Sequence, residues 1–161
     1  MKKILLILIF LPALSMAIDI SILNSEINLG TVPPDSGFYG AQPGNINLKI
    51  SNKTVAQTAE VYAEIDSPLL SPEGYQLPAD TLQWQIYWWT NKEVGPPYSV
   101  DISSSAGFNS WVPYRRSPAR VLRILSGVTA LDIQLGTTVR RVPSVQPEGV
   151  YATKVRFTVT E

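Results

Sequence analysis

Apolar and polar residues alternate with a period of two in several runs of this chain, and no comparable run has the period of a helix. Such alternation is typical of a strand with one face on a core and the other in water. The sequence therefore predicts an all-β fold built of antiparallel strands. The five clearest runs are 46–50, 59–65, 82–88, 131–135 and 151–159, and weaker ones are 18–23, 27–31, 98–102 and 120–125.

Residues that break strands separate these runs. Proline and glycine cluster at 33–37 with 43–44, at 67–78, at 95–97 and at 143–149, and 51–53 has the composition of a tight hairpin turn. Short strands at this spacing favour an Ig-like antiparallel β-sandwich of about seven to nine strands. Residues 117–125 could instead begin with one helical turn, since a serine precedes a proline there; we favour a strand.

The alternation also predicts which side chains form the core of the sandwich. Apolar residues of one parity in each run are expected to share the buried face. This gives Ile46, Leu48, Ile50, Val61, Ile65, Trp84, Ile86, Leu131, Ile133, Val155 and Phe157.

The first 17 residues have the pattern of a secretory signal. Two lysines precede an apolar run, which ends in Ser15-Met16-Ala17. The run is too short for a membrane-spanning helix, which needs about 20 apolar residues. We therefore expect cleavage after Ala17, no spanning segment after cleavage, and one domain over 18–161. The mature protein is expected in the periplasm, at the cell surface or in the medium.

The chain lacks both cysteine and histidine. An exported protein without cysteine has no disulfides, which fits a bacterial envelope better than a small disulfide-stapled module. Without histidine it lacks the commonest general base and metal ligand. Glu60, Glu64 and Asp66 share one strand face, but nothing singles them out as a catalytic pair. We therefore expect no enzyme, no metal and no cofactor.

Charge is divided unevenly along the mature chain. Residues 18–102 hold 3 basic and 10 acidic residues, a net charge of −7, and residues 103–161 hold 8 basic and 3 acidic, a net charge of +5. Such asymmetry could steer association with a partner or another copy. Alternatively, the two halves interleave in one sandwich and their charges mix.

Two groups of side chains are candidates for binding. Tyr87, Trp89, Trp111 and Tyr114 could stack on sugar rings or fill a partner's pocket, although a sandwich core also needs large rings. Arg115, Arg116, Arg120 and Arg123 could contact an anionic partner, although a solvated face would look the same. Nucleic acid is not expected for an exported domain with net acidic charge.

Both ends of the mature chain resemble known surface proteins. Residues 27–33 with 45–52 resemble the opening strands of bacterial surface Ig-like domains. Residues 147–159, which include Gly149, Tyr151 and an alternating strand, resemble the last strand of the fimbrial-subunit and spore-coat-U group. The resemblance implies assembly by strand addition at an open sheet edge. The chain departs from that group in having no cysteine and in placing Thr160 where an aromatic is usual.

These observations favour an exported structural or adhesive surface protein, a pilus- or coat-type subunit or assembly component that acts by strand pairing. Its expected partners are other envelope or surface proteins or further copies of itself. The segment 18–23 could be either a first strand or a donor strand. The alternative is a carbohydrate-binding sandwich that uses its aromatics to hold a glycan.

Overall fold

The structure is a computed structural model that describes residues 18–23, 39–91, 100–101 and 110–161. The side chains of 39–45, 88–91 and 100–101 are not among those described. The described residues form nine strands and no helix, which confirms the all-β prediction. The strands are β1 (Asp19–Ile22), β2 (Tyr39–Ser51), β3 (Ala59–Ile65), β4 (Leu82–Asn91), β5 (Val100–Asp101), β6 (Val112–Pro113), β7 (Ala119–Ile124), β8 (Leu131–Val139) and β9 (Val155–Thr160).

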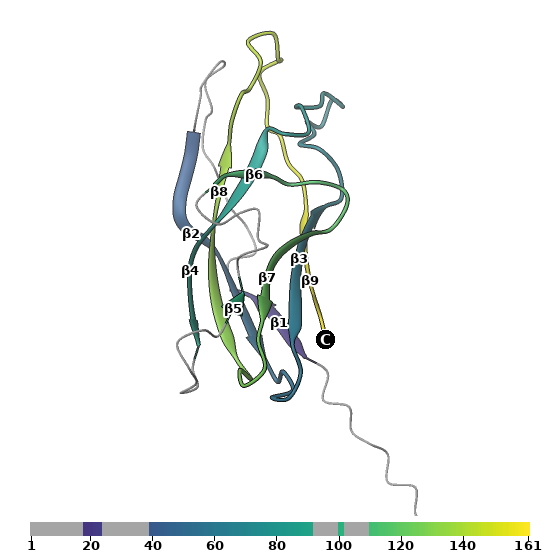
Figure 1. Cartoon of the computed structure of the whole chain (residues 1–161). Coiled ribbons are helices and arrows are strands. Elements are labelled where there is room, and N and C mark those ends of the chain that lie inside the picture. The colour runs from purple at the N-terminus through teal and green to yellow at the C-terminus, as the bar shows by residue number, and fades with distance from the viewer. Residues whose placement is uncertain (1–17, 24–38, 92–99, 102–109) are drawn as a thin grey trace, which may run out of the picture.

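The strands make two antiparallel sheets that face each other (Figure 1). Sheet A has five strands in the order β1-β2-β8-β4-β6, and sheet B has four in the order β5-β7-β3-β9. Only β1 and β2 follow one another within a sheet, and from β2 to β9 each successive strand lies in the other sheet. Strands that follow one another in sequence are therefore mostly not hydrogen-bonded neighbours, and the sheets are joined into one sandwich.

The core lies between the inward faces of the two sheets. In β3 every second residue is buried, and its inward residues Val61 and Ala63 belong to the same core cluster as Leu48 and Ile133 of sheet A. Nine of the eleven core residues predicted from the sequence are buried. The exceptions are Val155 and Phe157 on β9, which are only partly buried because this strand lies at the edge of sheet B.

Most of the predicted strands are confirmed, with shifted ends. The run 59–65 matches β3, and 120–125 is a strand, β7, with no helical turn. The expected loop at 43–44 is wrong, because β2 continues through Pro43 and Gly44. A register shift in the ladder with β8 between Gln42 and Ile46 accommodates these residues as an irregularity, where proline is tolerated. The predicted strand 27–31 and the signal segment 1–17 lie outside the described residues.

The expected hairpin turn at 51–53 is a connection between the two sheets. Asn52 has a φ of 59°, a left-handed conformation that asparagine adopts more readily than most residues. Its side-chain amide donates a 2.6 Å hydrogen bond to the carboxylate of Asp19. β2 and β3 lie in different sheets and do not pair, so the prediction of a hairpin at 51–53 is wrong.

Candidate interaction surfaces

The four aromatic candidates do not form one exposed surface. Tyr87 is 50% exposed and Trp111 is partly exposed, whereas Tyr114 is buried. The side chain of Trp89 lies outside those described. The ladder between β4 and β8 shifts by one residue between Ile86 and Trp88, so the period-two pairing does not continue unbroken to Trp89.

Tyr114 is a core residue, and the prediction that it lies on a binding surface is wrong. Its ring centre lies 6.4 Å from that of Trp84, and its hydroxyl lies 3.3 Å from the Thr137 hydroxyl. Burial raises the pKa of the Tyr114 hydroxyl. β6 pairs with β4, and the Tyr114 amide donates a hydrogen bond to the carbonyl of Leu82, which brings the ring into the core.

The four candidate arginines separate into two pairs with different surroundings. Arg115 and Arg116 are exposed in the connection between β6 and β7. Arg120 and Arg123 lie on β7, and both contact the same carboxylate oxygen of Glu60, at 2.8 and 2.7 Å. The second pair is therefore engaged within the fold.

Glu60 is the centre of this cluster on the outer face of sheet B. It also accepts a hydrogen bond from the hydroxyl of Tyr62, two residues along β3. The Tyr62 hydroxyl, followed by Arg123 and Arg120, lowers the pKa of Glu60 from 4.5 to about 2, and the same hydrogen bond raises the pKa of Tyr62. A general acid needs a carboxyl that is protonated near neutral pH, so this environment opposes such a role for Glu60.

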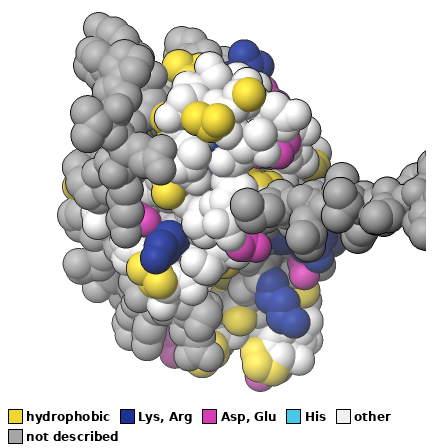
Figure 2. Space-filling view, turned by 90° about the horizontal axis from the view of Figure 1, so that it is seen from below, with side chains coloured by type: hydrophobic (Ala, Val, Ile, Leu, Met, Phe, Trp, Pro, Cys, Tyr) yellow, Lys and Arg dark blue, Asp and Glu magenta, His cyan; other side chains and the backbone are white. Residues whose placement is uncertain are grey.

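The fold brings acidic residues of the first half of the chain into ion pairs with basic residues of the second half. Four acidic residues of the first half, Glu60, Glu64, Asp66 and Asp80, pair with four arginines of the second half, Arg120, Arg123, Arg156 and Arg141. The pairs of Glu60, Glu64 and Asp66 form because β3, from the acidic half, lies between β7 and β9, from the basic half. Figure 2 shows basic and acidic side chains interspersed at one end of the sandwich. The interleaved alternative is therefore the one observed, and a simple attraction between unlike faces of two copies loses its support.

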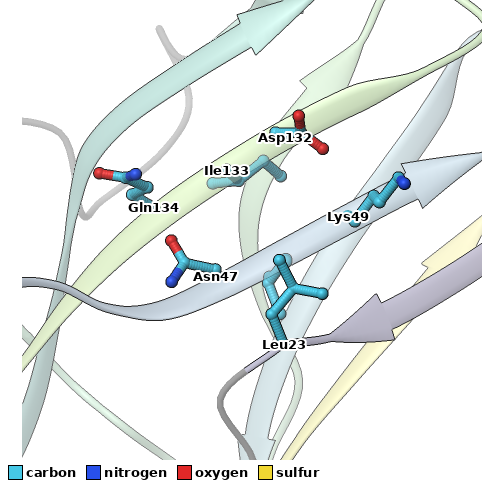
Figure 3. A pocket seen from close by; sticks show the side chains of 7 residues that line it. Leu23, Asn47, Lys49, Asp132, Ile133 and Gln134 are labelled. Atoms are coloured by element: carbon cyan, nitrogen blue, oxygen red, sulfur yellow. The ribbon is translucent and has the colours of Figure 1, made fainter.

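A shallow hollow of about 260 Å³ lies on the outer face of sheet A (Figure 3). Asn47 and Lys49 reach it from β2, Asp132 and Gln134 from β8, and Leu23 from the end of β1. The alternation predicted that the four polar residues face outward, but only the pairing of β2 with β8 places Asn47 opposite Gln134 and Lys49 opposite Asp132. The lining holds one cation, one anion and two amides, so it selects no charged ligand. In the described part of the chain, no group of acidic residues could hold a metal ion.

One end of the sandwich carries exposed apolar side chains that the sequence analysis did not single out. Tyr75, Val145 and Val150 lie in the connections that follow β3 and β8, which meet at this end (Figure 1). Leu70 and Ala152 exchange backbone hydrogen bonds of 2.9 and 2.8 Å between the two connections. The apolar side chains are therefore held on two loops that brace each other.

β9 is an edge strand of sheet B and has its own unpaired side. It pairs with β3 along Val155–Thr160, and no other described strand pairs with it. The Asp66 amide donates to the carbonyl of Lys154, so residues of that parity bond to β3. By the alternation of an antiparallel ladder, the N–H and C=O groups of Val155, Phe157 and Val159 point to the free side. This edge offers three donors and three acceptors.

The side chains of Val155, Phe157 and Val159 pack on the core yet stay partly exposed. β1, the edge strand of sheet A, lies beside β9 on this side of the sandwich (Figure 1). β1 pairs with β2, so residues 19–22 act as a first strand of their own sandwich in this structure. Ile18 and Ile20 are partly buried, whereas Ile22 and Leu23 are exposed. Within the described part of the chain, an apolar seam with backbone groups that no strand pairs therefore runs along this side.

Comparison of the sequence with protein-family models gives no match, and comparison with curated proteins gives none either. Among the described residues, no helix has the length and apolar character needed to cross a membrane.

Proposed function

We propose that this chain is an exported structural or adhesive surface protein that assembles by strand pairing, in the manner of a pilus- or coat-type subunit or assembly component. The observation that carries this proposal is the outer edge of β9, which no strand of the described residues pairs and which holds partly exposed apolar side chains at Val155, Phe157 and Val159. Proteins usually protect such edges, because an open edge is a template for another strand. The secretory pattern of residues 1–17 supports export of the chain.

The outer face of β9 supports the same proposal because it carries few of the usual protections of an edge. Residues 155–160 contain no proline and one charged residue, Arg156. The guanidinium of Arg156 is held by Glu64 and Asp66 at 3.0 and 2.9 Å, on the side of β3. A strand that approaches the free side therefore meets no unpaired charge within 155–160.

The alternative, a carbohydrate-binding sandwich, has less support from the described residues. Of its four candidate aromatics, Tyr114 is buried and Tyr87 is the most clearly exposed. Sugar rings are usually held by several aromatic and polar groups that converge, and Tyr87 lies outside the lining of the hollow on sheet A.

The proposal is tested by blocking the edge in the producing cell. Val159→Pro removes an N–H that faces the free side and leaves the ladder to β3 intact, since proline is tolerated at such edge positions. Val159→Ala is the matched control, because it shortens the side chain but keeps the N–H. Envelope fractions are separated in non-denaturing gels and probed with an antibody against the mature chain.

We expect high-molecular-weight species from the native chain and the alanine variant, and their loss in the proline variant. A native chain that stays in the cytoplasm would contradict export. An exported native chain found only as a monomer, with no protein that co-precipitates, would contradict assembly.

A further inference from the structure

The free edge of β9 is complementary to itself. We propose that it pairs with β9 of a second copy, antiparallel, about a two-fold axis through Phe157, so that sheet B becomes one eight-stranded sheet across the two molecules. This inference rests on the proposed strand pairing and adds the partner and the register to it.

In this register, every backbone donor and acceptor on the outer edge of β9 finds a partner. With Phe157 at the centre, Phe157 lies opposite Phe157 of the second copy, and Val155 lies opposite Val159. These are the residues whose N–H and C=O groups point to the free side. Opposite residues that point toward each other exchange two hydrogen bonds in an antiparallel pair. Three such pairs use all three donors and all three acceptors of each edge.

The side chains match in the same register. Val155, Phe157 and Val159 all lie on the inner face of sheet B, since their partners on β3 are the buried Ile65, Ala63 and Val61. Apolar side chains directly opposite one another on neighbouring strands stabilise a sheet. Pairing would therefore cover the part of Phe157 and the two valines that each single sandwich leaves exposed.

The charged side chains favour this register over the two neighbouring registers, which are centred on Arg156 and Thr158. Centred on Phe157, each Arg156 lies opposite Thr158 of the other copy. Centred on Arg156, the two arginines lie opposite each other, which is unfavourable. Centred on Thr158, Val155 lies opposite Glu161, whose carboxylate already accepts hydrogen bonds from Thr54. The register through Phe157 is thus the one that pairs three apolar residues without opposing charge.

A cysteine cross-link tests the register, and the chain contains no cysteine of its own. R156C and T158C proteins, both altered on the outer face, are mixed as dilute mature chains, concentrated and oxidised. Opposite residues of a non-hydrogen-bonded pair have Cα atoms about 4.5 Å apart, within disulfide range. Two copies of the same cysteine would lie about 8 Å apart, which is too far.

We expect disulfide dimers from the mixture and not from either protein alone. Cross-linking of R156C with itself, or of T158C with itself, would show another register and overturn the proposal. Absence of any cross-link would overturn it as well.

A charge pair at one exposed position provides a second test, independent of disulfide geometry. T158E places a carboxylate opposite each Arg156 of the second copy, and T158K places an ammonium there. We expect the dissociation constant of the dimer, measured by sedimentation equilibrium, to fall for T158E and rise for T158K, each by about three- to tenfold. Equal affinities of the two variants would contradict the register, and circular dichroism checks that both fold.

The two proposals can fail separately. If the native mature chain forms large species while no cysteine pair on β9 cross-links, pairing uses another edge, and only the inference about Phe157 is overturned. If the native chain is exported but monomeric at all concentrations and nothing co-precipitates with it, both proposals are overturned.

Discussion

Glu60 shows how a single residue can link two neighbouring strands of sheet B through their side chains. Tyr62 shares its strand, β3, while Arg120 and Arg123 reach it from β7. The position is exposed by parity, and the sequence analysis found it on a polar face. The arginines lie 60 and 63 residues away, so no local pattern could have identified them as its partners.

The lowered pKa of Glu60 predicts how stability changes with pH. The Tyr62 hydrogen bond and the two arginines hold the pKa at about 2 in the folded state, against 4.5 for the unfolded residue. Unfolding therefore takes up a proton between these values, so this carboxylate stabilises the fold above about pH 5, and that contribution is lost as pH falls toward 2. The free energy of unfolding, measured with denaturant, should therefore decrease more steeply for the native chain than for Glu60→Gln as the pH is lowered through this range. Identical slopes would contradict the assignment.

Phe157 gives a prediction about partial burial. A fully buried phenylalanine replaced by alanine costs about 3–5 kcal/mol, but Phe157 is only partly covered, so Phe157→Ala should cost about 2 kcal/mol in dilute monomer. Leu122→Ala, at a fully buried site of the same sheet, should cost about 2–5 kcal/mol. The stability losses of the two variants can be compared from their urea unfolding midpoints at low protein concentration. A loss at Phe157 well above that at Leu122 would show that β9 is covered in the monomer.

At the scale of elements, alternation predicted most strands because one face of a sandwich strand packs on the core and the other contacts water. β3 is the clearest case, since its inward and outward residues alternate without interruption. The prediction failed where bulges enter. Pro43 and Gly44 signalled a loop, yet the neighbouring strand β8 keeps them in β2. β6 has only two residues, too few for any periodicity, and so the burial of the adjacent Tyr114 could not be anticipated.

The connection between β2 and β3 depends on the backbone of Asn52. With a φ of 59°, a residue that has a β-carbon and no local hydrogen bond is strained by about 1–2 kcal/mol, whereas glycine is not. Asn52→Ala and Asn52→Gly both lose the hydrogen bond to Asp19. The difference between their free energies of unfolding therefore measures the cost of the left-handed backbone conformation. We expect the alanine variant to be about 1 kcal/mol less stable than the glycine variant in thermal or urea unfolding. Equal stability would contradict a left-handed Asn52.

At the scale of the whole molecule, the sequence predicted the fold class but not the order of the strands in the two sheets. It indicated a sandwich, and it predicted strands at 18–23 and 151–159. β1 and β9 are edge strands of sheets A and B, and they lie on the same side of the sandwich. Their adjacency depends on the order of strands in each sheet, which follows from long-range pairing. The same pairing brings the acidic and basic halves together, so the division of charge describes the sequence rather than two faces of the fold.

The central claim is that the mature chain assembles through strand pairing. Sedimentation velocity of residues 18–161, measured over a wide range of protein concentration at low salt, tests it most directly. We predict that species larger than the monomer appear as concentration rises and that Val159→Pro removes them, while Val159→Ala retains them. A single monomeric boundary at every concentration, with no partner recovered from the envelope, would contradict the claim.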